Sequence, residues 1–123
     1  MDKIAQGLIS LKLDAEGEIR YITSVQEVIK LLKEGAEGKI VLVDDAGTTF
    51  LAPVLPKLAG VVCQTGALGS HLAIVTREFE IPALMGINIQ NPSALDRKYV
   101  MIKHEEGTQG ALFIVEQNGE KAV

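Results

Sequence analysis

The chain has 123 residues, of which 47% are hydrophobic and 23% charged, with a formal net charge of −4, and this length suits a single domain over residues 1–123. No apolar run approaches the roughly 20 residues that span a bilayer, the first residues lack a signal-peptide pattern, and no basic cluster suggests nucleic-acid binding. With one cysteine, Cys63, and therefore no internal disulfide, we expect a cytoplasmic protein without membrane or nucleic-acid partners.

The N-terminal residues predict a hairpin. Residues 4–13 alternate loosely between apolar and polar side chains, which is typical of a strand. Residues 14–18 are suited to a turn, and residues 20–23 predict a short second strand. The two strands are therefore expected to pair with each other.

A helix is predicted next. Ser24 and Glu27 have the spacing of a capping box, in which each side chain bonds a free backbone N–H of the first turn. Gly35 predicts the end of the helix, because glycine readily adopts the left-handed conformation found there. The apolar face of this helix is predicted to consist of Val25, Val28, Ile29, Leu31 and Leu32.

The middle of the chain alternates between strands and helices. Residues 39–43 and 60–63 are short apolar runs that predict buried strands. Residues 49–58 are predicted to be partly helical, with Pro53 and Pro56 limiting the regular part.

A second full helix is predicted over 71–79, with Pro82 just beyond its end. Its apolar residues wrap most of the circumference, so we expect a helix buried on most sides with only its N-terminus exposed. These residues are Leu72, Ala73, Ile74, Val75 and Phe79.

The remaining strands are predicted at 83–85, 99–103 and 111–115, with a turn at 105–110. Strands that alternate with helices in the middle, and hairpins at both ends, indicate an α/β fold with a mixed sheet.

The segment from the strand at 60–63 to His71 predicts an anion site. Gln64 to Gly69 form a turn of small residues, and Gly69 or Ser70 is placed to cap the helix that starts at His71. Unpaired backbone N–H groups and the positive end of the helix dipole attract phosphate at such a point. A histidine there is a nucleophile near neutral pH. We expect His71 to be catalytic, and the phosphate-stabilising residues to be Thr49, Thr65, Gly66, Gly69 and Ser70.

Simpler interpretations of these residues remain open. His71 alone is also compatible with a cap or a half-buried core histidine, and Ser70 with a plain N-cap. Thr48 and Thr49 follow a strand end and are equally suited to loop capping. Arg77 lies six residues beyond His71, so we favour structural pairing or partner docking over phosphate contact. No metal-ligand spacing is present, and no metal is expected.

Three motifs follow one another in the sequence: Gly66-Ala67-Leu68-Gly69-Ser70-His71, then Thr76-Arg77, then Ile81-Pro82-Ala83-Leu84-Met85-Gly86. At these residues the chain resembles the phosphohistidine (swivelling, or mobile) domain of the phosphoenolpyruvate-utilising enzymes, such as pyruvate phosphate dikinase and phosphoenolpyruvate synthase. The resemblance covers about residues 38–90. It departs from the family pattern at Ala67, where a glycine is usual, and at Gly69, where a threonine or apolar residue is usual.

The resemblance implies a three-layer β/β/α fold and a phosphoryl carrier. His71 would take a phosphoryl group from a nucleotide or from phosphoenolpyruvate and pass it to an acceptor. ATP and Mg²⁺ would belong to an ATP-grasp-like nucleotide-binding partner, and the acceptor to a pyruvate- or phosphoenolpyruvate-type domain, so this chain alone binds no cofactor. It would be the phosphohistidine component of a phosphotransferase and not a complete enzyme.

Two other functions are compatible with the same residues. A non-catalytic interaction or regulatory module would keep the swivelling fold, and the altered loop from Gly66 to Gly69 favours it. A weaker alternative is the small subunit of a dehydratase-like enzyme with a similar swivelling fold.

Overall fold

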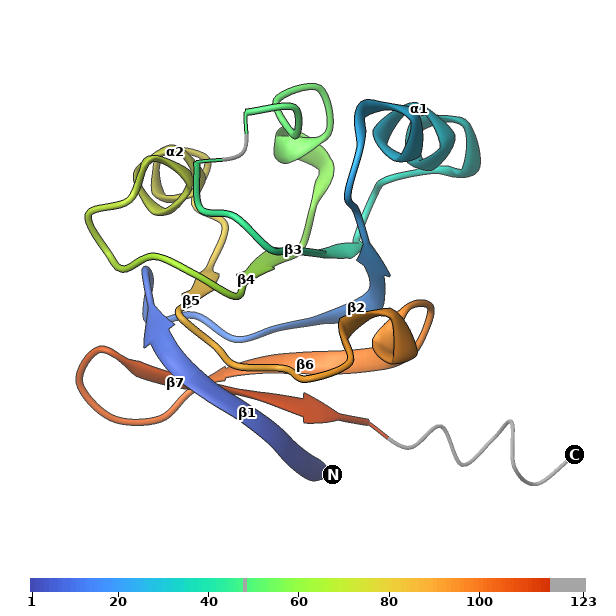
Figure 1. The fold of residues 1–123 in the computed structure, drawn as a ribbon. Helices are drawn as coiled ribbons and strands as arrows, with labels where there is room; N and C mark the ends of the chain where they lie inside the picture. The colour runs from blue at the N-terminus through green and yellow to red at the C-terminus, as the bar shows by residue number, and fades with distance from the viewer. Residues whose placement is uncertain (48, 116–123) are drawn as a thin grey trace, which may run out of the picture.

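Strands and helices alternate along the residues that the computed structural model describes, 1–47 and 49–115 (Figure 1). The strands are β1 (Asp2–Ile9), β2 (Ala15–Tyr21), β3 (Ile40–Val43), β4 (Gly60–Cys63), β5 (Ala83–Met85), β6 (Tyr99–His104) and β7 (Gln109–Ile114). The α-helices are α1 (Val25–Glu34) and α2 (His71–Glu78), and the short 3-10 helices are η1 (Leu55–Lys57) and η2 (Pro92–Leu95).

The strands close into a barrel in the order β1-β5-β4-β3-β2-β6-β7. Neighbours among β2, β3, β4 and β5 pair in parallel, and the remaining pairs are antiparallel. The register of β3 and β4 runs from Ile40 opposite Gly60 to Val43 opposite Cys63, so the two apolar runs predicted as buried strands lie side by side in the sheet. The α/β class with a mixed sheet is confirmed as well. Closure of the sheet into a barrel is a feature that the sequence patterns did not predict.

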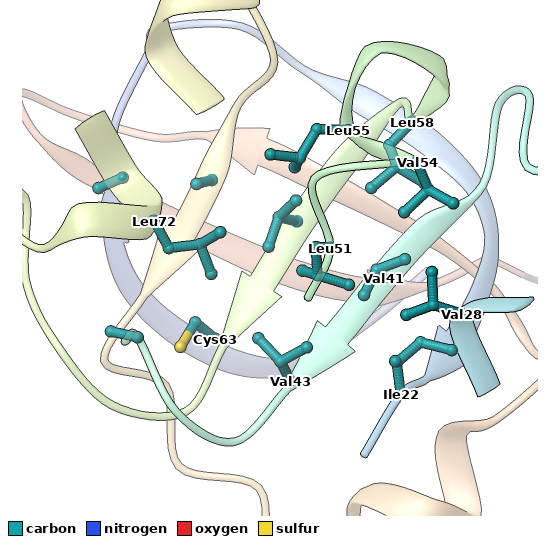
Figure 2. Close-up of a cluster of buried hydrophobic side chains, with 14 of the residues drawn as sticks. Ile22, Val28, Val41, Val43, Leu51, Val54, Leu55, Leu58, Cys63 and Leu72 are labelled. Carbon is teal, nitrogen blue, oxygen red and sulfur yellow. The ribbon is translucent and has the colours of Figure 1, made fainter. Parts of the chain in front are cut away.

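Two apolar clusters give the fold its layers. Successive side chains of a strand point to opposite faces, so Val41 and Val61 pack towards the helices while Leu42 and Val62 point into the barrel. The cluster between helices and strands joins Val28 of α1 and Leu72 of α2 to the parallel strands (Figure 2). The inner cluster fills the space between the parallel and antiparallel strands. A helical layer, a parallel layer and an antiparallel layer therefore stack as β/β/α.

The end of α1 follows the predicted pattern, and at its start the Ser24 half of the capping box forms while Glu27 bonds Thr23 in place of the Ser24 N–H. The backbone N–H of Glu27 donates to Ser24 Oγ at 3.4 Å, and the Glu27 carboxylate accepts from the backbone N–H of Thr23 at 2.7 Å. Gly35 ends the helix with φ 107°, and its N–H donates to the Leu31 carbonyl at 2.9 Å. The local sequence therefore sets both ends of α1.

The predicted apolar face of α1 is only partly buried. Val28 and Leu31 are buried, but Val25, Ile29 and Leu32 are 51%, 47% and 39% exposed. A helix that rests on a sheet buries only the residues that recur every three or four positions on one side. Of the five residues of the predicted apolar face, only Val28 and Leu31 therefore contribute to the core.

The predicted N-terminal hairpin was also wrong. β1 pairs with β7 and β5, whereas β2 starts at Ala15, within the predicted turn, and pairs with β3 and β6. Ser10, which follows β1, bonds Ala83 of β5 twice, through its backbone N–H and its hydroxyl oxygen, both at 2.9 Å. These pairings join residues far apart in sequence, so a local pattern contains no information about them.

Residues 49–58 do not form the predicted helix. They make turns that end in η1, and no α-helix occurs between β3 and β4 in the part of the chain that is described. Pro53 and Pro56 each lack a backbone N–H and exclude the preceding turn of a helix. Two prolines this close together leave too few residues for a regular helix.

A buried cation ties together segments that lie on one side of the barrel. The Arg20 side chain on β2 is only 6% exposed, and its Nη1 donates to Glu34 Oε1 of α1 at 2.8 Å. Its Nε lies 3.7 Å from Asp96 Oδ1, and Arg97 Nη2 lies 3.6 Å from Glu34 Oε1. The hydrogen bond from Arg20 holds the pKa of the Glu34 carboxyl below its ordinary value of 4.5.

This shift predicts how stability changes in acid. A carboxyl whose pKa is lowered by folding stabilises the fold above its unfolded pKa, and the contribution is lost as the pH falls through the folded pKa. Glu34→Gln should therefore lose less stability than the wild type between about pH 5 and pH 3. Urea denaturation across that range measures the difference, and equal losses in the two proteins would contradict it.

Candidate functional site

The loop between β4 and α2 lies at the carboxyl edge of the parallel strands. The segments that follow β3, β4 and β5 all leave the sheet at this edge, which is where parallel sheets usually bind ligands (Figure 1). Three hydrogen bonds link these segments: Ala46 N–H to Thr65 Oγ1 at 3.0 Å, Gly86 N–H to the Thr65 carbonyl at 3.3 Å, and Ile87 N–H to the Cys63 carbonyl at 3.3 Å. The base of the loop is therefore held from both sides.

Gly66 is the position in the loop that only glycine fits. Its φ is +85°, and a β-carbon there would lie 2.5 Å from Ala46 Cβ and 2.6 Å from Ser70 Oγ. Ala67, which stands where the family has a second glycine, does not need that freedom, because the non-glycine residues with positive φ in the described chain are Glu80 and Arg97. The alanine therefore fits the turn without backbone strain.

Ser70 stands at the N-cap of α2, but its hydroxyl has a different task. Its Oγ accepts the Ala67 N–H at 2.9 Å, and its own N–H donates to the Ala67 carbonyl at 3.0 Å. No hydrogen bond runs from its side chain to the first turn of the helix within the described residues. The predicted N-cap position is confirmed, and the hydroxyl closes the turn at Ala67 instead of bonding the first turn of the helix.

His71 is the first residue of α2 and is exposed, as the turn and capping residues predicted. The N–H of Leu72 is occupied by the Ala46 carbonyl at 3.3 Å, and that of Ile74 by the Ser70 carbonyl at 3.1 Å. Among the described residues, no hydrogen bond uses the backbone N–H of His71 or Ala73. Two donors at the positive end of the helix therefore remain free beside the imidazole.

The other predicted site residues have separate positions. Thr65 is engaged through its hydroxyl oxygen with Ala46, so it anchors the loop. Gly69 borders open space, since a β-carbon there would contact nothing within 4 Å. Thr49 is exposed on the segment after β3, and Thr48 lies outside the described residues. A phosphate-stabilising role for any of them stays a prediction.

Arg77 makes the structural contact that we favoured from its spacing. Its Nη2 donates to the Leu68 carbonyl at 3.1 Å, which ties the last turn of α2 back to the loop. The side chain thus restrains the loop from the far end of the helix. A guanidinium has five N–H donors, so the other four stay available for further hydrogen bonds.

The prediction that α2 is buried on most sides was wrong. Leu72, Ala73 and Thr76 are buried, whereas Ile74 and Phe79 are 44% and 47% exposed. The Thr76 hydroxyl donates to the Leu72 carbonyl at 2.8 Å, so a polar side chain is accommodated on the inner face. The outer face of α2 therefore exposes two apolar side chains, Ile74 and Phe79, that are not buried in the core of this chain.

A chain of hydrogen bonds along the same edge was missed by the sequence analysis. The Tyr21 hydroxyl donates to Asp44 Oδ2 at 2.6 Å, Gln64 Nε2 donates to Asp44 Oδ1 at 2.7 Å, and the Ile89 N–H donates to Gln64 Oε1 at 3.0 Å. The bond to Asp44 raises the pKa of Tyr21 to about 12. Isolated polar residues that follow strands gave no signal of this linkage. The chain joins β2 to the segments after β3, β4 and β5.

The site has few groups that could hold a metal or act as a second nucleophile. Within the described ranges, no three His, Cys, Asp or Glu side chains gather in a way that could hold a metal ion. Cys63 is buried, and burial raises the pKa of its thiol, which disfavours the reactive thiolate.

A cleft of about 380 Å³ opens beside the loop, bordered by Gly66, Gly86, Gln6 and Gln109. No helix of the described chain has the length and apolar character to cross a membrane.

The model of the family "PEP-utilising enzyme, mobile domain" matches residues 35–107. The chain is 42% identical over 77 residues to the phosphoenolpyruvate-dependent phosphotransferase system protein of Salmonella typhimurium, covering 61% of this chain and 10% of that protein. It is 31% identical over 93 residues to the probable phosphoenolpyruvate synthase of Archaeoglobus fulgidus, covering 76% of this chain and 12% of that protein. The chain thus spans about a tenth of the length of these relatives.

Solved structures are similar to a lesser degree. The N-terminal domain of Enzyme 1 - Nitrogen is 25% identical, with a TM-score of 0.48 over 75% of this chain and 38% of that one. Muramoyltetrapeptide carboxypeptidase from Oxalobacter formigenes has a TM-score of 0.56 over 94% of this chain and 51% of that one, at 12% identity. The second likeness concerns the fold alone.

The geometry of the loop predicts a large loss of stability for alanine at one of its glycines and almost none at another. Gly66→Ala should lower the free energy of unfolding by about 2 kcal/mol or more, because it adds both left-handed strain and a clash with Ala46 and Ser70. Gly69→Ala should change it by no more than about 0.5 kcal/mol, because its β-carbon points into open space. Chemical denaturation compares the two variants. A Gly66→Ala protein as stable as the wild type would show that this turn is not constrained.

Proposed function

This chain belongs to the family of mobile domains of PEP-utilising enzymes, and on that premise we propose that it is a phosphoryl carrier in which His71 bears the phosphoryl group. The observation that carries the proposal is the placement of His71. Its imidazole is exposed at the start of α2, beside two free backbone N–H groups and on a loop held by Gly66. Family membership supports phosphoryl transfer in general, and this geometry supports His71 as the acceptor.

The chemistry requires a neutral imidazole and a donor that approaches in line. A ring nitrogen of His71 donates its lone pair to phosphorus while the bond from phosphorus to the leaving oxygen breaks, and that oxygen keeps the electron pair. The second ring nitrogen retains its proton. Free N–H groups and the helix dipole at the N-terminus of α2 offset the phosphoryl charge, by about 0.3–1 kcal/mol for the dipole when exposed and by more when water is excluded.

We assign the site that binds the phosphoryl donor and the site that binds the acceptor to partner domains. A phosphoryl group bound to a nucleotide needs Mg²⁺ and several cationic groups around it. We therefore assign ATP and Mg²⁺ to a nucleotide-binding, ATP-grasp-like partner, and the acceptor to a pyruvate- or phosphoenolpyruvate-type domain. In this scheme the chain supplies the nucleophile and moves between the two sites.

Chemical labelling tests the nucleophile without a partner. Phosphoramidate is a small donor that phosphorylates imidazole, and the chain has two histidines, so each serves as a control for the other. One acid-labile, base-stable phosphate should appear on His71, and it should be absent from His71→Ala and retained in His104→Ala. Mass spectrometry of the intact protein at high pH reads the result. Equal labelling at His104 would favour the non-catalytic module.

Ser70→Ala tests the loop rather than the nucleophile. Loss of the hydroxyl leaves the Ala67 N–H without its acceptor and loosens the turn before His71. The variant should lose about 1 kcal/mol of stability and be labelled more slowly than the wild type. If the variant is labelled as fast as the wild type, the turn does not position the imidazole for the reaction.

A further inference from the structure

The outer face of α2 has a reactive and an apolar group next to each other. His71, Ile74 and Glu78 are three and four residues apart, a spacing that places them on one side of a helix, and all three are exposed. Ile74 is 44% exposed, and it lies one helical turn from His71, the proposed nucleophile. An isoleucine in this place contributes little to the core of this chain.

The charges around His71 are unfavourable for a phosphoryl group. Over residues 44–91 the only cations in the sequence are Lys57 and Arg77, against four acidic residues, Asp44, Asp45, Glu78 and Glu80. Lys57 pairs with Glu37 at 3.2 Å and lies before β4, whereas the loop lies after it. Arg77 uses one of its five N–H donors on the Leu68 carbonyl and lies six residues beyond His71 along α2. A phosphoryl group has a charge near −2, so a partner surface that supplies further cations would complement this part of the chain.

We propose that the outer face of α2 docks the domain that holds the phosphoryl donor, with Ile74 as the apolar anchor. This proposal rests on the proposed function of His71. The partner is defined by its chemistry: an apolar pocket opposite Ile74, surrounded by lysine or arginine side chains that face Glu78 and the phosphoryl group. With phosphoenolpyruvate as donor, the bond between phosphorus and the enol oxygen breaks, the imidazole takes the phosphoryl group, and enolpyruvate takes a proton from water.

The second helix provides a matched control. Ile29 of α1 is also a helical isoleucine, and it is 47% exposed. α1 and α2 lie at opposite ends of the helical layer, with the segment that contains η1 between them (Figure 1). A substitution at Ile29 therefore makes the same chemical change far from His71.

The experiment measures transfer to this chain in trans. The probe is the probable phosphoenolpyruvate synthase of Archaeoglobus fulgidus with phosphoenolpyruvate and Mg²⁺, and the label on the chain is read by intact mass. Ile74→Lys should reduce kcat/KM for the chain about tenfold or more, mainly by raising KM, as the loss of an interface anchor does. Ile29→Lys should react like the wild type. Glu78→Lys should also slow transfer, and most strongly at low salt.

Phosphoramidate labelling of the same proteins separates docking from chemistry. All three variants should take this small donor at the wild-type rate, since it needs no docking surface. Equal effects of Ile74→Lys and Ile29→Lys on transfer from the synthase would overturn the proposal. Labelling of the wild type by phosphoramidate but not by the synthase would overturn docking alone, and failure with both donors would remove the proposed function. A dimer of this chain that Ile74→Lys dissociates, seen by sedimentation, would assign the face to a second copy and overturn the proposal.

Discussion

The close approach at Gly66 is the constraint on which the site depends. Its α-carbon lies where Ala46, Ser70 and Met85 leave no room for a side chain, and its φ of +85° directs the chain out of β4. These neighbours come from the segment after β3, the N-cap of α2 and the end of β5. The parallel strands can bring their carboxyl ends together around the loop only because the residue at this point has no β-carbon.

The loop is restrained at several points once that turn is formed. Thr65 is bound to Ala46, Ser70 closes the turn onto Ala67, and Arg77 reaches back to Leu68. The inner face of α2 packs on the sheet, with Leu72 and Ala73 in the same buried cluster as Val43, Val61 and Met85. The imidazole of His71 at the start of such a helix has a defined position, which the proposed transfer between two sites would require.

Local patterns were reliable where local physics decides the structure. The cap at Ser24, the stop at Gly35, the apolar strands at 40–43 and 60–63 and the helix start at His71 were predicted correctly. Each depends on hydrogen bonds or steric limits within a few residues. The hydrogen-bonded chain through Asp44 and Gln64 could not be predicted, because it joins three polar side chains and one backbone N–H from four separate segments.

The sequence by itself determined the local unit of the candidate site: a buried strand, a glycine turn and a helix that begins with a histidine, together with the family to which they belong. The tertiary structure alone decided that β1 joins β5 and β7 instead of β2, that the sheet closes into a barrel, and that Ile74 faces solvent. The reason is that short-range bonds and backbone sterics are encoded within a few residues. Strand partners, and the side of a helix that meets the sheet, depend on how distant segments share the limited space of one core.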